Sequence, residues 1–187
     1  VEPPPFICPR TGRATFHLAA TDDGQILDAS AVGVCEVTGR RLPADELVRC
    51  SWTGKQAAKE LMDFCSLSGK PVLRSELRPC SVCQEKVSPA ALQEGVCSAC
   101  RGLQTVSKAD PRMARLLAEY PLLDRWRRWQ LAETETVYIL TASGLWKKLL
   151  VVVDKETLEL RHLATGNRLQ SHWQPVEPGQ YAFVLRE

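Results

Sequence analysis

Four cysteines near the middle of the chain form two C-x2-C pairs, Cys80 with Cys83 and Cys97 with Cys100, and thirteen residues separate the pairs. A C-x2-C pair brings two thiolates within reach of one metal ion, and tetrahedral zinc takes four ligands at about 2.3 Å. Eight cysteines in 187 residues is a lower density than that of disulfide-stapled proteins. We therefore interpret the four as ligands of one zinc ion rather than as two disulfides or four free thiols.

A cysteine followed by a short turn sequence recurs through the first hundred residues. The copies begin at Cys8, Cys35, Cys50, Cys65, Cys80 and Cys97, and Cys35, Cys50 and Cys65 are fifteen residues apart. Only the last two copies have a second cysteine. The first four have Thr11, Thr38, Thr53 or Ser68 in its place, each followed by a glycine. Because self-similarity indicates a copied supersecondary unit, we interpret these four as knuckle-shaped turns that lack the second metal ligand.

The single cysteines Cys8, Cys35, Cys50 and Cys65 allow two interpretations. They are either small buried residues of separate turns or, if the four turns converge, the ligands of a second zinc, to which His17 could contribute. Hydroxyl groups are poor zinc ligands, so we favour the first interpretation. It predicts a positive φ at the glycine of each turn, where the chain bends back: Gly12, Gly39, Gly54 and Gly69.

These segments resemble the zinc-ribbon class with its CPxCG-like knuckles. The resemblance covers about the first hundred residues, is specific for Cys80, Cys83, Cys97 and Cys100, and implies bound zinc. Strings such as CEVTGRRLPADELVRC also resemble the non-catalytic regions of large bacterial helicases of the DEAD/DEAH type. The sequence has neither a G-x4-G-K-[ST] loop nor an Asp-Glu-x-Asp/His box, so any ATPase would lie outside this chain.

The composition changes directly after the last cysteine, Cys100. All cysteines lie in the first hundred residues, whereas four of five tryptophans lie in the remainder. The break predicts two domains, residues 1–104 as a run of knuckle hairpins and residues 105–187 as an α+β domain. The longest apolar run, LLVVV, is too short to cross a membrane, and we expect an excised, cytoplasmic piece of a larger protein.

The second half combines helical and strand patterns. Apolar residues recur at helical spacing from Met113 to Trp129, with an interruption at Pro121, and predict a helical pair. Four later segments predict antiparallel strands: TVYILTA, LWKKLLVVVD, LELRHLA and YAFVLRE. The fold class that follows is mainly β with α+β, in which tandem zinc-knuckle hairpins precede a small domain of helices on an antiparallel sheet.

Basic residues flank the tryptophans of the RWRRW segment. Guanidinium groups contact phosphates and indoles stack on bases, so this cluster is a candidate nucleic-acid contact. The simpler interpretation is an amphipathic helix with the tryptophans in the core and a solvated basic face. The net charge of +2 is too small to decide between them. The candidate contacts are Arg125, Arg127, Arg128, Lys147 and Lys148.

A metal-dependent nuclease or hydrolase site could be assembled from Asp154, Glu156 and His162, but DKET at residues 154–157 is more typical of a hairpin turn. We therefore predict no enzyme in this chain. The leading interpretation is a zinc-binding accessory region of a larger intracellular protein that docks a protein partner or nucleic acid. The alternatives are a direct nucleic-acid-binding module of a helicase-type protein and a small metal-dependent nuclease.

Overall fold

The computed structural model describes residues 3–170 and 172–186. It divides into two compact units, Val1–Cys65 with Lys70–Leu77 and Ser66–Gly69 with Arg78–Glu187. The boundary that the sequence predicted after residue 104 falls inside strand β15 (Gln104–Val106), which pairs with the strands that follow it. Among the helices of the described residues, none has the length and apolar character needed to cross a bilayer.

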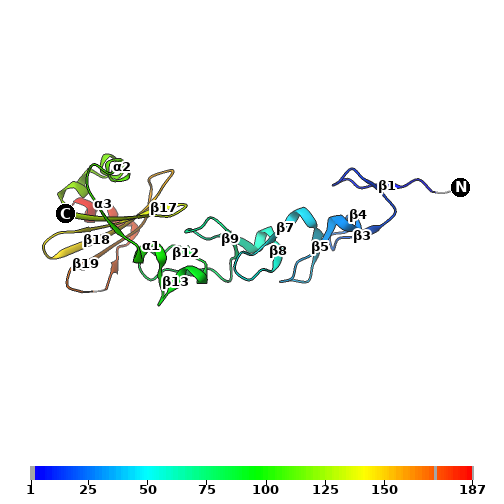
Figure 1. Ribbon diagram of the computed structural model, residues 1–187, viewed down its shortest axis with the longest axis horizontal. Helices are drawn as coiled ribbons and strands as arrows, with labels where there is room; N and C mark the ends of the chain where they lie inside the picture. The colour runs from blue at the N-terminus through cyan, green and yellow to red at the C-terminus, as the bar shows by residue number, and fades with distance from the viewer. Residues whose placement is uncertain (1–2, 171, 187) are drawn as a thin grey trace. The chain divides into compact units, whose positions relative to one another are not determined.

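The first unit consists of short antiparallel hairpins (Figure 1). The pairs are β1 (Phe6–Ile7) with β2 (Ala14–Thr15), β3 (Leu18–Ala20) with β4 (Ile26–Asp28), β5 (Val32–Val34) with β6 (Arg41–Pro43), β7 (Leu47–Arg49) with β8 (Gln56–Ala58), and β9 (Met62–Phe64) with β10 (Pro71–Leu73). Single 3-10 turns, η1 (Ala29–Ala31), η2 (Ala44–Glu46) and η3 (Lys59–Leu61), connect successive hairpins. Strands and turns recur every fifteen residues, so the cysteine spacing is the period of the fold.

Backbone hydrogen bonds join each hairpin to the next. The N–H of the residue after the cysteine donates to a carbonyl of the following hairpin: Glu36 to Gln56 at 2.9 Å and Ser51 to Pro71 at 2.9 Å. Isolated two-stranded hairpins are marginal in water, and these have only two or three residues per strand. Contacts between neighbouring hairpins, together with the burial of Leu27, Ala57 and Val72, therefore supply the stability that a single hairpin lacks.

The turn at Thr21 is a further copy of the repeat. It contains no cysteine and was therefore not found from the cysteine spacing. The Asp22 N–H donates to the Arg41 carbonyl at 3.0 Å, as Glu36 does to Gln56. Thr21 is buried and its hydroxyl accepts from the Gln25 N–H at 3.0 Å, so a threonine stands where other copies have cysteine. The interval of 27 residues between Cys8 and Cys35, nearly two periods, is the sequence signal for it.

The second unit contains two small hairpins and a six-stranded antiparallel sheet (Figure 1). The hairpins are β11 (Arg78–Pro79) with β12 (Lys86–Val87), and β13 (Leu92–Gln93) with β14 (Val96–Cys97); η4 (Pro89–Ala91) lies between them and α1 (Ser98–Arg101) follows. The sheet order is β15, β16 (Arg128–Glu133), β17 (Val137–Ser143), β18 (Lys147–Asp154), β19 (Leu160–Asn167) and β20 (Gln174–Pro175). A mainly β chain with small antiparallel sheets was predicted, and that part of the fold class is confirmed.

The core of the second unit lies between this sheet and the helical segments α2 (Pro111–Glu119), η5 (Pro121–Arg125), η6 (Pro178–Gln180) and α3 (Tyr181–Arg186). Met113 and Leu116 of α2 are fully buried in it. Alternate residues of the central strands meet them, among them Leu140 of β17 and Val151 of β18. The residues between them, Ile139, Leu150 and Val152, are fully buried as well, so the central strands are buried on both faces.

Two elements predicted from the sequence are wrong. Trp129 lies on strand β16 rather than on a helix, because η5 ends at Arg125 and the alternation of RWQLAE turns Trp129 inward and Arg128 outward. The three-residue spacing of Trp126 and Trp129 concealed this alternation. The segment YAFVLRE was predicted as a strand, but residues 181–186 form α3. Its apolar spacing suits a helix as well, since Val184 and Leu185 both contact the core.

The different environments of two tryptophans give a direct stability test. Trp129 is 8% exposed and its Nε1 donates to the Leu123 carbonyl at 3.2 Å, whereas Trp146 is 69% exposed. Trp129→Ala should lower the free energy of unfolding by about 3 to 5 kcal/mol through the cavity that it leaves. Trp146→Ala should change it by less than about 0.5 kcal/mol. Urea unfolding of both variants checks this, and equal losses would contradict the placement of Trp129.

Candidate metal centre

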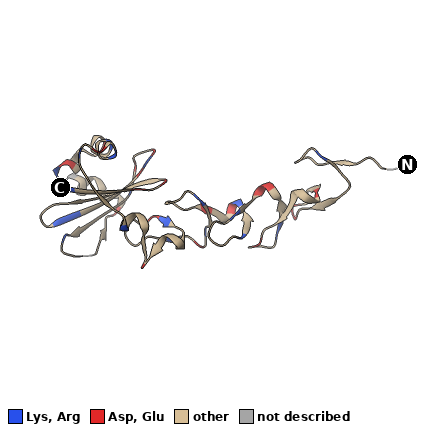
Figure 2. Cartoon of the chain, in the orientation of Figure 1, with Lys and Arg blue, Asp and Glu red and all other residues tan. Residues whose placement is uncertain are grey.

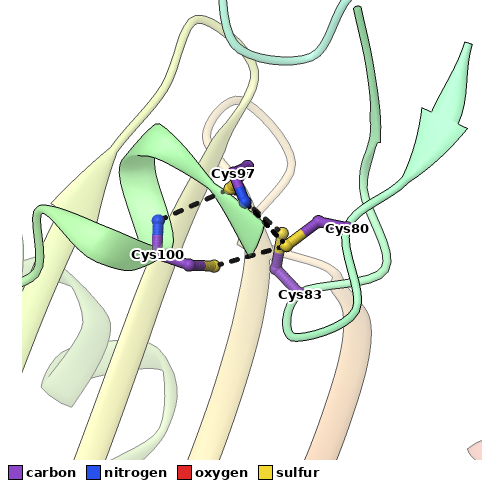
Figure 3. Close-up of side chains that lie close together, drawn as sticks. All are labelled: Cys80, Cys83, Cys97 and Cys100. Atoms are coloured by element: carbon purple, nitrogen blue, oxygen red, sulfur yellow. Dashed lines mark hydrogen bonds between the residues drawn. The ribbon is translucent and has the colours of Figure 1, made fainter. Parts of the chain in front are cut away.

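Two short elements bring the four paired cysteines together (Figure 3). Cys80 and Cys83 lie in the turn between β11 and β12, and Cys97 ends β14 and caps α1, which contains Cys100. The turn between β13 and β14 has positive φ at both Glu94 and Gly95, as tight hairpin turns require. The Ser81 N–H donates to the Gly95 carbonyl at 2.9 Å. This bond fixes the second pair of cysteines beside the first.

The four sulfur atoms form one compact group. All lie within 4.8 Å of one another, with 3.9 Å from Cys80 Sγ to Cys100 Sγ and 3.8 Å from Cys83 Sγ to Cys97 Sγ. These separations are far longer than the 2.05 Å of a disulfide, and all four cysteines are free. Cys80, Cys83 and Cys97 are buried and Cys100 is partly exposed. The group could hold a metal ion.

Backbone N–H groups point at the sulfurs. Cys80 Sγ accepts from the N–H of Val82 at 3.4 Å and of Cys97 at 3.3 Å, and Cys97 Sγ accepts from the N–H of Cys100 at 3.4 Å. Such donors stabilise negative charge on sulfur. The site therefore favours the thiolate form that metal ligation requires.

Without a cation, the four thiols differ in how readily they lose a proton. Hydrogen bonds from the Cys100, Cys83 and Cys97 thiols lower the pKa of Cys80. The same contact with Cys80 raises the pKa of Cys100, because a second negative charge would lie beside the first. A divalent cation at the centre would remove this repulsion.

The first pair sits in a turn with the same backbone as the single-cysteine turns. The Cys80 N–H donates to the Glu85 carbonyl, and the Gln84 N–H donates to the Cys80 carbonyl. In the same way, the Cys35 N–H donates to the Arg40 carbonyl and the Gly39 N–H to the Cys35 carbonyl. The predicted positive φ is confirmed at 67° in Gly12, 75° in Gly39, 74° in Gly54 and 62° in Gly69. Gln84 has φ 61° at the equivalent place. The second pair differs from the prediction: it lies at the start of α1 rather than on a hairpin tip, because the Cys97 sulfur caps that helix.

The single cysteines lie in separate turns. Among the described residues, the group of Cys80, Cys83, Cys97 and Cys100 is the one place where three or more Cys, His, Asp or Glu side chains gather closely. Cys8, Cys35, Cys50 and Cys65, with His17, therefore do not gather into the second metal site considered from the sequence. All four sulfurs are buried.

The sulfurs of Cys8, Cys35 and Cys50 accept hydrogen bonds instead. Cys50 Sγ accepts from the N–H of Thr53 and from that of Leu73 in the next hairpin, both at 3.4 Å. Hydrogen bonds from the Asp28 N–H and the Thr11 hydroxyl lower the pKa of Cys8 to about 7. Burial raises the pKa of Cys35, but the Thr38 hydroxyl and the Ala58 N–H outweigh it and lower that pKa to about 7. The threonine in place of a second cysteine thus donates to the first.

Substitution of Cys50 tests this role of sulfur as an acceptor. Cys50→Ala removes the acceptor and leaves the Leu73 N–H buried and unpaired, which should cost about 1 to 3 kcal/mol. The Leu73 amide should then exchange with solvent faster by tenfold or more. Cys50→Ser keeps an acceptor oxygen and should lose much less protection. Amide exchange by NMR checks both variants, and equal protection in parent and Cys50→Ala would contradict the bond.

A buried carboxylate links the cysteine turn to the large sheet within the second unit. Glu85 is 8% exposed, and its Oε2 accepts from the Ser66 hydroxyl at 2.6 Å and from Arg161 Nη1 at 3.3 Å. Arg161 also contacts Asp154 Oδ2, at 2.5 Å from Nη2. The cysteine turn is therefore held against β19 by a charged hydrogen-bond network.

Asp154, the first residue considered for a nuclease site, has other partners. Asp154 Oδ1 accepts from the N–H groups of Glu156 at 2.8 Å and Thr157 at 3.0 Å, so its carboxylate caps the turn as the DKET pattern predicted. His162 is partly buried on β19, and burial lowers its pKa. Among the described residues, Asp154, Glu156 and His162 do not gather as a metal-binding group.

Asp154 gives a prediction for the pH dependence of stability. Its turn N–H groups and Arg161 lower the pKa of Asp154 to about 2. Because the folded pKa lies below the unfolded value of about 3.9, the stabilisation is complete above about pH 4 and is lost as the pH falls toward 2. Urea unfolding at pH 5 and pH 2.5 should show a larger loss in the parent than in Asp154→Asn. Equal losses would contradict the assignment, since Asp110 and other carboxylates contribute to both proteins.

The basic residues singled out from the sequence separate into two groups. Arg125, Lys147 and Lys148 line one groove of the second unit, together with Trp126 and Trp146. Arg127 and Arg128 are exposed but do not line it. Figure 2 shows basic residues, in blue, on strand β18, which begins with Lys147 and Lys148. Trp146, which lies in the turn directly before this pair, was not singled out from the sequence, because a single exposed aromatic residue carries no periodic signal.

No protein-family model, curated protein or solved structure matches this chain.

Proposed function

We propose that Cys80, Cys83, Cys97 and Cys100 bind one zinc ion, and that this chain is a non-enzymatic docking region of a larger intracellular protein. The observation that carries the proposal is the spacing of the sulfurs. With Zn–S bonds of about 2.3 Å, the edge of a regular ZnS4 tetrahedron is about 3.8 Å. Two of the sulfur pairs are at 3.8 and 3.9 Å, and all four sulfurs lie within 4.8 Å of one another. These separations support a four-sulfur zinc site.

The proposed zinc has a structural role. Four thiolates fill the tetrahedral coordination of zinc, whereas catalytic zinc keeps a position open for water or substrate. The elements that carry the ligands are two-residue strands and one four-residue turn of helix, which bury few apolar side chains of their own. For so small a ribbon the free energy of metal binding is free energy of folding. This supports a zinc-ribbon-like element rather than an enzyme.

The docking role rests on the hairpins of the first unit. Large apolar residues are exposed at repeated places around the cysteines: Val34 and Phe64 directly before one, and Val37 and Trp52 two positions after one. A hairpin array that leaves apolar side chains exposed at regular intervals is suited to contact a protein partner along its length. Free thiols in every turn fit the reducing interior of a cell.

Metal analysis of purified protein tests the zinc proposal. The parent should contain about one zinc per chain after gel filtration, and Cys97→Ser should contain almost none because three ligands hold the ion much less tightly. Cys50→Ser is the matched control: it makes the same change at a buried cysteine outside the group and should keep one zinc. A parent content below half an equivalent, or equal contents in parent and Cys97→Ser, would refute the site.

Removal of the metal should loosen a limited part of the chain. Treatment with a chelator should increase hydrogen exchange in residues 78–104 before it affects the strands β16–β19, because zinc ligation replaces a hydrophobic core only in that segment. Mass spectrometry of exchanged peptides measures this. An equal increase in hydrogen exchange across the second unit would contradict a local effect of zinc. No increase in exchange would show that residues 78–104 do not depend on zinc.

A further inference from the structure

A groove on the second unit is lined by an exposed tryptophan and by basic side chains. It is lined by the end of η5, the turn between β17 and β18, the end of β19 and the start of β20, and its volume is about 850 Å³. Trp126 and Trp146 are the aromatic residues of its lining, and Arg125, Lys147 and Lys148 are the basic ones. We call this site the tryptophan groove.

The fold holds Trp146 outward by a tight turn. The Gly144 N–H donates to the Lys147 carbonyl at 3.0 Å, which closes the turn and leaves Leu145 and Trp146 at its tip. The Trp146 carbonyl accepts from the Arg168 N–H at 2.8 Å, so the tip is tied to the chain that follows β19. Trp146 is 69% exposed. Its indole is presented on a fixed backbone without being covered by this chain.

Lys148 and a glycine shape the wall of the groove. Lys148 crosses Gly166, where an added Cβ would lie 2.7 Å from Lys148 Cε and 2.9 Å from the His172 carbonyl oxygen, so the chain packs closely on this glycine. Lys148 Nζ donates to the Gln170 carbonyl at 2.6 Å and lies 4.2 Å from the ring centre of Trp173. Lys148 is thus engaged within the protein. Lys147 and Arg125 are both exposed, although Arg125 also donates to the Val184 carbonyl at 3.4 Å and lies over the Trp126 ring.

The lining has one sign of charge. Among its described residues are three basic side chains and the amides of Asn167, Gln170 and Gln174, and no Asp or Glu. Cations suit phosphates, amides suit the hydrogen-bonding edges of bases, and an exposed indole suits the face of an unpaired base. A double helix would keep its bases stacked on each other and away from Trp146, whereas an acidic peptide would make no use of the indole face.

We propose that the tryptophan groove binds single-stranded nucleic acid, with a base stacked on Trp146 and backbone phosphates at Arg125 and Lys147. The proposal goes beyond the protein-docking role proposed above by adding a nucleic-acid contact on the second unit, and it does not require the metal. The groove is built from η5 and the large sheet, and none of its lining residues is among the cysteines or their turn.

Fluorescence anisotropy with labelled dT15 and rU15 tests the proposal on the full chain. Because stacking on an aromatic residue contributes about 1 to 3 kcal/mol per base, Trp146→Ala should weaken binding by about fivefold or more. Trp52→Ala, which removes a partly exposed tryptophan of the first unit, should leave the affinity unchanged. Lys147→Ala should weaken binding, and Arg127→Ala, the same loss of charge outside the groove, should not.

The salt dependence tests the phosphate contacts separately. For single strands, the slope of log affinity against log salt is about −0.7 per phosphate contact, so Arg125→Ala with Lys147→Ala should reduce its magnitude by about 1.4. The proposal is overturned if the parent does not bind dT15 or rU15 at low salt, or if Trp146→Ala binds like Trp52→Ala. It is also overturned if a labelled poly-glutamate peptide or a duplex binds as tightly as the single strands.

The zinc content of the same samples separates this proposal from the previous one. Binding that is kept by Cys97→Ser without zinc would support the groove. A parent that holds one zinc but binds no oligonucleotide would refute the groove alone, and a parent that binds single strands through Trp146 but holds no zinc would refute the metal site alone.

Discussion

The sulfur atom in each cysteine turn is the acceptor on which the small hairpins depend. Strands of two or three residues cannot bury enough apolar surface to fold alone, so each hairpin must be fixed by its neighbours. Cys50 illustrates how: its sulfur accepts one N–H from its own turn and one from the next hairpin, twenty-three residues away. Cys80 accepts from Val82 and from Cys97 in the same way. This contact between a cysteine turn and the next hairpin can repeat once in every fifteen-residue period of the chain.

A metal site is a stronger form of the same arrangement. In the turns at Cys8, Cys35 and Cys50, a threonine hydroxyl donates to the cysteine sulfur, and in the turn at Cys80 a second cysteine stands in that place. Replacing the hydroxyl by a thiol exchanges a hydrogen-bond donor for a second ligand, and a cation then supplies the positive partner of both sulfurs. The backbone need not change, since the turns share their hydrogen bonds and a positive φ at the fifth residue.

Local features of this chain could be predicted from its sequence, and features that depend on distant residues could not. The glycine φ values and the grouping of the paired cysteines follow from short-range spacing. Thr21 was missed because its equivalence to cysteine is shown by the hydrogen bond from the next residue, the Asp22 N–H, to the Arg41 carbonyl. Trp129 was placed on a helix because the spacing that puts it beside Trp126 fits a helix, while the strand arises from pairing with β17. The tryptophan groove could not be predicted because its lining comes from four separate segments, and none of these segments alone indicates a groove.

The central claim is that the two paired cysteine motifs alone bind metal, through four sulfurs. X-ray absorption at the zinc edge of the purified chain measures the ligands directly. The account predicts a single shell of four sulfur atoms at about 2.3 Å, in a sample that contains one zinc per chain. Nitrogen or oxygen atoms in that shell, or two zinc ions per chain, would contradict it.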